Sequence, residues 1–241
     1  RLEDLGVHGV AILFDDMPGG VDSLAQRQAE ILVDVHHWLD RPLLRFCPTY
    51  YSDDPVLDRA FGQRPENYLA DLVSSLPDGL IPFWTGPTVC SEEVPAAHLE
   101  ALRDTIGRPL ALWDNYPVND SRTRAKHLYL APLRGRAPTD TLDSHWCNAM
   151  NQAALSLPAL SSLARLHGRE VGDAPRVLAE AGVTDALVRA CLPLADRDRE
   201  SLDEQEKASL LSLAAAGSAA AVELRDWLEG LYRFDPACLN D

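Results

Sequence analysis

The sequence is poor in basic residues and contains no long apolar run. Its 22 Lys and Arg residues stand against 37 Asp and Glu, which gives a formal net charge of -15. A chain of this charge repels the phosphates of nucleic acids and of anionic membrane surfaces at long range. No stretch approaches the roughly 18 to 20 apolar residues that cross a bilayer. We therefore expect a soluble globular protein with no nucleic-acid partner and no membrane span, and the composition does not separate a cytoplasmic protein from a secreted one.

The sequence also lacks the cysteine patterns that hold metals or form a dense disulfide framework. Its 5 cysteines are at least 43 residues apart, with no CxxC pair and no Cys/His metal spacing. We expect these cysteines to be buried free thiols. His36 and His37 are adjacent and have no recognised ligand pattern around them. The sequence predicts neither a metal site nor a cofactor.

Short apolar runs alternate with longer helical patterns over the first 165 residues. This alternation is typical of βα units built on a parallel sheet. Apolar positions at helical spacing separate the runs; Leu24, Ile31, Leu32, Val35 and Trp38, for example, fit one face of a helix. Five runs are predicted to form strands: Val10–Phe14, Leu43–Cys47, Leu80–Trp84, Leu110–Trp113 and the segment around His145–Cys147.

Each predicted strand ends in a cluster of polar or aromatic residues. The clusters are Asp15–Asp16, Thr49–Tyr51, Trp84–Pro87, Trp113–Tyr116 and Cys147–Asn148. In a TIM-type barrel the active site forms at the carboxyl ends of the strands, where the loops of successive units converge. The pattern therefore predicts an α/β fold with a functional site at this end of a (β/α)8 barrel.

The chain contains too few βα units to close such a barrel. An eight-stranded barrel needs about 250 residues, and the pattern supplies five units before it changes. We predict that residues 1–167 form about the last five βα units of a barrel whose N-terminal strands lie in a preceding segment. Residues 168–241 are rich in Ala, Leu, Glu and Arg and predict a helical domain. It is expected to contain a helix over residues 174–192 and another that begins at a capping box, Ser201–Glu204, and ends near Gly230.

Asp15 and Asp16 are adjacent carboxylates at the expected mouth of the barrel. Two like charges a few ångströms apart raise the pKa of at least one of them, which suits acid-base chemistry. Neighbouring residues of an extended strand point to opposite sides. A retaining glycosidase needs two groups disposed in this way around the anomeric carbon. By itself an Asp-Asp pair is weak evidence for catalysis, because such pairs also occur in metal sites, helix caps and solvated loops.

Five longer motifs give the pair a context. They are Leu13–Met17 (LFDDM), Phe46–Tyr51 (FCPTYY), Trp84–Cys90 (WTGPTVC), Trp113–Asp120 (WDNYPVND) and Asn148–Gln152 (NAMNQ). In order and spacing they resemble glycoside hydrolase family 84, the O-GlcNAcase family, over roughly residues 1–165. The resemblance implies a retaining exo-β-N-acetylglucosaminidase acting on glycans or glycoproteins that carry terminal N-acetylglucosamine. It also implies substrate-assisted catalysis, in which the substrate's acetamido oxygen attacks the anomeric carbon and forms an oxazoline.

The resemblance assigns a role to each matched residue. Asp15 would polarise the acetamido N–H, and Asp16 would protonate the leaving oxygen and then activate water. Asp120 and Asn148 would bind the distal sugar hydroxyls. Tyr51 and Asn115 would contact the acetamido group or the acidic pair. Trp113 would form a wall of the acetamido pocket, and Cys47 and Val89 would line it.

The sequence departs from the family pattern at several positions. Tyr50 stands where Glu is common, Ala149 where Pro is common and Ala131 where Gly is common. The lysine and the backbone glycine with which the family's first βα units contact the sugar have no counterpart in this sequence. A non-hydrolysing carbohydrate-binding or scaffold protein of the same fold is therefore an alternative. A metal-dependent hydrolase with Asp15 and Asp16 as ligands, joined at most by His145, is a more distant one.

Overall fold

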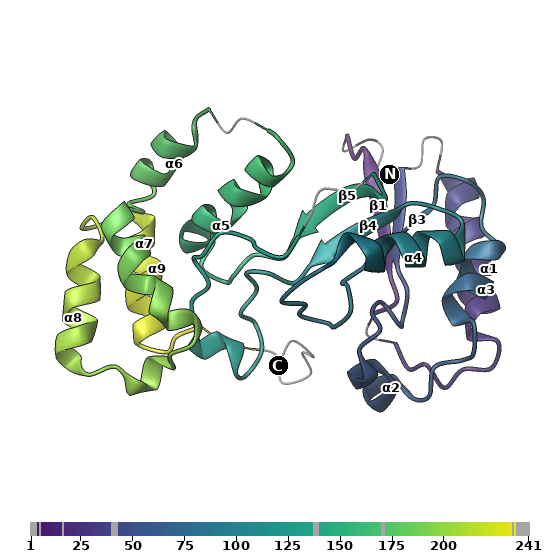
Figure 1. The fold of residues 1–241 in the computed structure, drawn as a ribbon, viewed down its shortest axis with the longest axis horizontal. Helices are drawn as coiled ribbons and strands as arrows, with labels where there is room; N and C mark the ends of the chain where they lie inside the picture. The colour runs from purple at the N-terminus through teal and green to yellow at the C-terminus, as the bar shows by residue number, and fades with distance from the viewer. Residues whose placement is uncertain are drawn as a thin grey trace. The chain divides into compact units, whose positions relative to one another are not determined.

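The computed structural model describes residues 4, 6–15, 17–39, 43–136, 140–169, 172–232 and 234. The chain forms two compact units (Figure 1). The first contains Arg1–Trp113 and Thr139–Trp146, and the second contains Asp114–Pro138 and Cys147–Asp241. The predicted boundary after residue 167 lies inside the second unit. The division into a barrel part and a helical domain remains a prediction.

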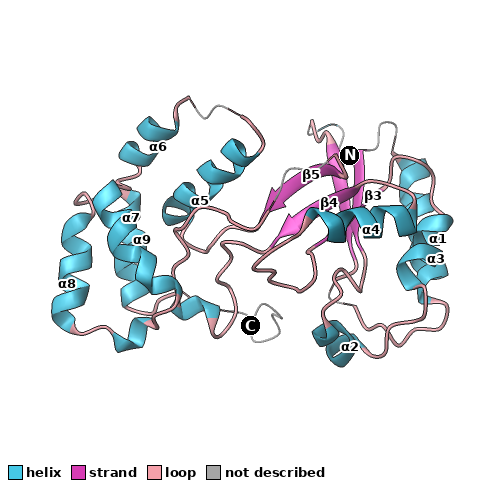
Figure 2. Cartoon of the chain, viewed as in Figure 1, coloured by secondary structure: helices cyan, strands magenta, loops and turns pink. Residues whose placement is uncertain are grey.

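Within the described residues, five strands form one sheet in the order β1-β2-β3-β4-β5. They are β1 (Gly9–Leu13), β2 (Leu43–Cys47), β3 (Ile81–Trp84), β4 (Leu110–Asp114) and β5 (Leu142–Cys147), drawn in magenta in Figure 2. The first four pair in parallel, with Leu13 opposite Cys47 in the β1/β2 ladder and Phe83 opposite Ala111 in the β3/β4 ladder. The prediction of a parallel α/β sheet with these five strands is confirmed.

Side-chain contacts show that the sheet curls. In a flat sheet β2 and β5 would lie roughly 14 Å apart, since neighbouring strands are separated by about 4.8 Å. Arg45 of β2 nevertheless forms an ion pair with Asp143 of β5 and donates to Ser144 Oγ at 3.2 Å. Phe83 of β3 contacts the ring of Trp146 on β5 edge-on, with 5.7 Å between centroids. The face that carries these side chains is therefore concave.

The helices of the first unit pack beside the strands. They are α1 (Leu24–Trp38), α2 (Pro55–Phe61), α3 (Tyr68–Ser74) and α4 (Ala96–Ile106). α1 packs against α3, and α3 packs against α4. The expected face of α1 is partly wrong, because Ile31 and Trp38 are 44% and 76% exposed. The buried stripe of α1 consists of Leu24, Ala25, Gln28, Ala29 and Leu32.

The second unit is predominantly helical. Its α-helices are α5 (Ala153–Leu166), α6 (Ala174–Glu180), α7 (Asp185–Cys191), α8 (Glu204–Leu213) and α9 (Ala219–Leu228). They surround an apolar core that includes Leu155, Leu187 and the fully buried Trp227, whose Nε1 donates to the Ala125 carbonyl at 3.1 Å. Among the described residues, no helix is long and apolar enough to pass through a membrane.

Two helix predictions in this unit are wrong in their boundaries. The segment 174–192 breaks into α6 and α7, because Gly182 adopts a left-handed φ of 80° between them. The capping box is formed by Asp203 and Glu206, two residues beyond the predicted pair. The helix that it starts ends at Leu213, and α9 begins separately with the Ser218 side chain as its cap.

Candidate active site

The predicted site residues of the first unit lie at the carboxyl ends of its strands. Asp15 follows β1 by two residues and is half-buried. Cys47 is the last residue of β2 and is 4% exposed, while Tyr51 lies in the next loop and is 8% exposed. Val89, 2% exposed, lies in the loop after β3. The carboxyl ends of parallel strands lie at the same end of a sheet, so these four residues come from one end of the sheet.

Hydrogen bonds join the loops that carry these residues. The Phe14 amide, immediately before Asp15, donates to the Cys47 carbonyl at 2.9 Å. The Thr85 amide after β3 donates to the Tyr51 carbonyl at 3.0 Å. The Asp54 carboxylate accepts two further hydrogen bonds, one from Val56 N at the start of α2 and one from Val89 N at 3.1 Å. The loops after β1, β2 and β3 are thus tied to one another.

Trp113 and Trp84 differ in their surroundings. Trp113 lies on β4, is partly exposed and contacts Phe83 edge-on with 5.0 Å between centroids. Trp84 is 2% exposed and its Nε1 donates to His98 Nε2 at 3.1 Å. Trp84 is therefore a core residue of the first unit.

Asp16 lies outside the described residues, but the loop that follows it is described. A Cβ on Gly19 would lie 2.0 Å from the Tyr50 hydroxyl oxygen, so this position needs glycine for steric reasons. Tyr50 is fully buried and its hydroxyl donates to the Gly62 carbonyl at 2.7 Å. The tyrosine that departs from the family pattern therefore packs under the loop that leaves the Asp pair. Burial, together with the nearby Asp58 carboxylate, raises the pKa of Tyr50.

The second unit carries Asn115, Asp120 and Asn148. Asn148 Nδ2 donates to Asn115 Oδ1 at 3.2 Å, so two of the predicted sugar-binding amides contact each other. Asn115 is 8% exposed, and Asn148 and Asp120 are half-buried. Asn115 is therefore buried in this unit, while Asn148 and Asp120 keep part of their surface exposed.

Asn119 is a structural residue of the loop that carries Asp120. It is 1% exposed, and its Nδ2 donates to the His127 carbonyl at 3.1 Å and to Gln152 Oε1 at 2.7 Å. Its Oδ1 accepts from Asn151 N at 3.0 Å. These three bonds use its amide to hold together the loops that carry Asp120 and Asn148.

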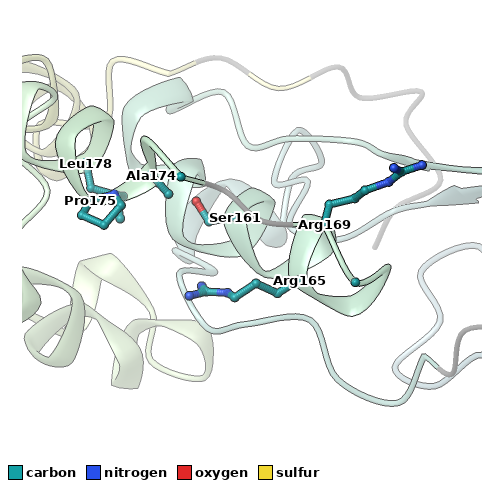
Figure 3. A pocket seen from close by; sticks show the side chains of 8 residues that line it. Ser161, Arg165, Arg169, Ala174, Pro175 and Leu178 are labelled. Carbon is teal, nitrogen blue, oxygen red and sulfur yellow. The ribbon is translucent and has the colours of Figure 1, made fainter.

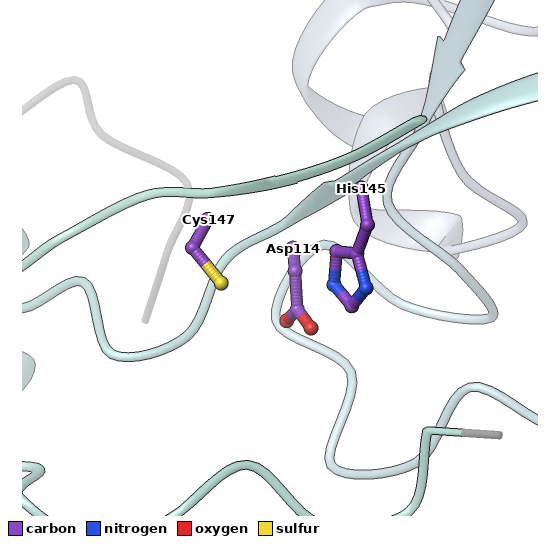
Figure 4. A group of neighbouring side chains, drawn as sticks. All are labelled: Asp114, His145 and Cys147. Carbon is purple, nitrogen blue, oxygen red and sulfur yellow. The ribbon is translucent and has the colours of Figure 1, made fainter. Parts of the chain in front are cut away.

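Sequence reasoning missed a buried ion pair beside Asn115. Arg136 Nε and Nη2 donate to the two carboxylate oxygens of Asp114, both at 2.8 Å, and the side chains are 5% and 2% exposed. A carboxylate at the end of a buried strand needs such a partner, and that requirement was the available signal. Figure 4 shows Asp114 beside Cys147. Burial, with a smaller effect of Asp114, raises the pKa of the Cys147 thiol to about 12.

Two further observations bear on alternative sites. Among the described residues, Asp15 belongs to no group of three or more side chains that could share a metal ion. A cavity of about 520 Å³ lies in the second unit, lined by residues that include Ser161, Arg165, Arg169 and Pro175 (Figure 3). None of the predicted site residues lines it.

Comparison with known proteins identifies the family. Residues 1–187 match the family model described as beta-N-acetylglucosaminidase, so the chain belongs to this family of glycoside hydrolases. The resemblance to glycoside hydrolase family 84 is thereby confirmed.

The relatives are O-GlcNAcases. Protein O-GlcNAcase from Rattus norvegicus and that from Mus musculus are each 31% identical to the chain over 146 residues, which cover 57% of the chain and 15% of the relative. An O-GlcNAc hydrolase variant from Thermobaculum terrenum matches in structure with a TM-score of 0.70 and 26% identity, covering 95% of this chain and 59% of that one. The chain thus spans about a seventh of these curated relatives and about three fifths of the solved structure.

Proposed function

We propose that this protein is a retaining exo-β-N-acetylglucosaminidase that removes terminal β-linked N-acetylglucosamine from protein Ser/Thr or from glycans. The observation that carries the proposal is the family match over residues 1–187, with Asp15 two residues beyond β1 at the end of the sheet where barrel enzymes place their chemistry. The names of the relatives, which describe hydrolysis or removal of O-GlcNAc, agree with this substrate class.

In the proposed mechanism the substrate supplies the nucleophile. Asp15 accepts a hydrogen bond from the acetamido N–H, which increases electron density on the acetamido oxygen and orients it toward the anomeric carbon. Asp16 protonates the leaving oxygen as the oxazoline forms. Asp16 then removes a proton from water, which opens the oxazoline with net retention of configuration.

The remaining matched residues bind the sugar in this proposal. Asp120 and Asn148 hydrogen-bond the distal hydroxyls, and Asn115 and Tyr51 contact the acetamido group or the acidic pair. An apolar wall for the acetyl methyl is assigned to Trp113, Cys47 and Val89. Burial of Cys47, Tyr51 and Val89 to below a tenth of their surface suits a small apolar pocket.

We also propose that the sheet is part of a (β/α)8 barrel completed by a further segment of the protein. The concave face carrying Arg45, Phe83 and Trp146 supports closure, because a sheet that curls within five strands can complete a barrel with three more. β1 is the first strand in the sheet order, and its Leu13 side chain is 48% exposed. An added strand would cover this edge. Residues 168–241 would then form a helical domain beside the barrel.

The test is hydrolysis of aryl β-N-acetylglucosaminides by the protein made from its complete gene. We expect turnover by the unaltered protein and a loss of about 10² to 10⁴-fold in kcat/KM for Asp16→Asn, smaller for aglycones that leave easily. Asp34→Asn is the matched control, because Asp34 is exposed on α1. Full activity of Asp16→Asn would remove Asp16 as the acid. Binding of a thiazoline inhibitor without any turnover would favour the carbohydrate-binding alternative.

A further inference from the structure

A closed ring of buried hydrogen bonds contacts the carbonyl of Phe14, the residue that precedes Asp15. The Thr49 amide donates to the Tyr68 hydroxyl at 3.0 Å, and that hydroxyl donates to Gln28 Oε1. Gln28 Nε2 donates to Thr49 Oγ1 at 2.8 Å, which closes the ring. Thr49 Oγ1 in turn donates to the Phe14 carbonyl at 2.8 Å. Three elements contribute: α1 supplies Gln28, α3 supplies Tyr68 and the loop after β2 supplies Thr49.

The direction of every bond in the ring is determined. Because a backbone amide can only donate, the Tyr68 hydroxyl accepts from Thr49 and has its proton left for Gln28 Oε1. This contact fixes the orientation of the Gln28 amide, so its NH2 group faces Thr49 Oγ1. The Thr49 hydroxyl then accepts from Gln28 and must direct its own proton to the Phe14 carbonyl. The ring therefore presents one donor to one defined backbone atom.

That backbone atom belongs to the peptide that leads into Asp15. The carbonyl of Phe14 is held by Thr49, and the amide of Phe14 is held by the Cys47 carbonyl at 2.9 Å. The Phe14 side chain is itself 3% exposed. With both polar groups and the side chain of Phe14 fixed, the plane of the peptide bond to Asp15 is fixed as well. The course of the chain at the start of the acidic pair follows from it.

The composition of the ring is unusual for a site whose only task is stability. Thr49 is fully buried, and Gln28 and Tyr68 are each 2% exposed. Polar side chains at such positions lose their hydration, whereas apolar residues of the same shape are often nearly neutral or stabilising. A fully satisfied buried network does provide a single, rigid arrangement. Rigidity has the largest effect on the reaction rate when it fixes a residue next to a reacting group.

We infer that Thr49, Gln28 and Tyr68 are positioning residues that hold Asp15 in the orientation needed to polarise the acetamido group. The inference rests on the proposed function, because it assigns the ring a role through Asp15. A displacement of about 1 Å at a catalytic group can cost around 10²-fold in rate. Loss of the ring therefore affects kcat, while the contacts that bind the rest of the sugar, and with them KM, change little.

The first experiment compares Thr49→Val with Thr49→Ser in the protein made from its complete gene. The valine variant keeps the shape of threonine and loses the donor to Phe14, and we expect a fall in kcat of roughly 10 to 10²-fold with KM within about 3-fold. The serine variant keeps the hydroxyl and should recover most of the activity. Leu99→Ala on α4 is the control for general destabilisation, because Leu99 is 1% exposed and belongs to the same unit. It should lower the melting temperature without lowering kcat more than about 2-fold.

The second experiment separates positioning of Asp15 from a general structural effect. In an Asp15→Asn background Thr49→Val should cause little additional loss of kcat, since the group that it positions is already removed. Leu99→Ala should have the same small effect in both backgrounds. If Thr49→Val reduces kcat equally with and without Asp15, the positioning role is wrong.

Tyr68→Phe and Gln28→Met provide the same test should Thr49→Val fail to fold. The failure of this inference differs from that of the proposed function. An unaltered protein that hydrolyses the substrate, with ring variants that retain full kcat, refutes the inference alone. An unaltered protein without turnover refutes both.

Discussion

Replacing Arg136 by methionine tests the energetic role of the buried ion pair at the end of β4. The substitution keeps most of the side-chain volume and leaves the Asp114 carboxylate buried with neither of its two 2.8 Å bonds from Arg136. Removing one partner of a buried pair costs about 3 to 5 kcal/mol, because the other charge is left uncompensated. Both side chains are at most 5% exposed, so water screens the pair little. We expect a loss of this size in the free energy of unfolding.

A matched variant exists in the same unit. Arg176 forms ion pairs with Asp173 and Glu180, but its side chain is 63% exposed and those of its partners are 78% and 61% exposed. Arg176→Met should therefore cost less than about 1 kcal/mol. The measurement is urea unfolding followed by circular dichroism at 222 nm for both variants. Equal losses for the two would refute the argument from burial, and Asp114→Leu combined with Arg136→Met should recover much of the loss.

Three further predictions concern the second unit. The carboxylate of Glu223 caps α5, because it accepts hydrogen bonds from the amides of Ala154 and Leu155 in the first turn of that helix. Glu223→Ala should lower the free energy of urea unfolding by about 1 to 2 kcal/mol. No change would show that this cap contributes nothing to stability. With a pKa of about 12, only about one Cys147 thiol in 10⁴ is ionised at pH 8, so Cys147→Ser should leave the initial rate of thiol labelling of the native protein unchanged. A clear drop in that rate would contradict the raised pKa. Burial raises the pKa of Tyr116 from 10.0 to about 12, so the folded state favours the neutral phenol. The contribution of this phenol to stability is complete below pH 10 and is lost as pH rises to about 12. Tyr116→Phe should therefore flatten the decline in unfolding free energy over this window, and an unchanged slope would contradict the prediction.

β1 to β4 were predictable because parallel strands are largely continuous apolar runs, whereas β5, with the sequence LDSHWC, carries only a weak apolar signal. All five expected runs became strands, each shifted by at most a few residues, and the polar clusters fell at their carboxyl ends. The buried face of α1 was harder to predict. Ala25, Gln28 and Ala29 do not register as strongly apolar, yet they are buried, while Ile31 and Trp38 are exposed. The spacing of apolar residues reflects side-chain hydrophobicity alone. It does not depend on the shape of the surface that the helix contacts, and that shape decides which small side chains are buried.

The polar part of the site was only partly predictable. Asp15, Tyr51 and Asn148 carry the family motifs and could be named from them. Gln28 and Tyr68 lie in segments that predict ordinary helices, and their relation to Thr49 depends on contacts across 19 to 40 positions of the chain. A cationic partner for Asp114 could be expected, since a buried carboxylate requires a cation. Nothing in the sequence pattern identified Arg136 as that partner.

The central claim, that the acetamido group of the substrate performs the attack, is tested most directly by substrates with progressively fluorinated N-acetyl groups. Each fluorine withdraws electrons from the carbonyl oxygen and weakens it as a nucleophile without changing the aglycone. We predict that kcat/KM of the protein made from its complete gene falls steeply from acetyl to trifluoroacetyl and that the first sugar released has the β configuration. A rate independent of fluorination, or release of the α-anomer, would contradict the account.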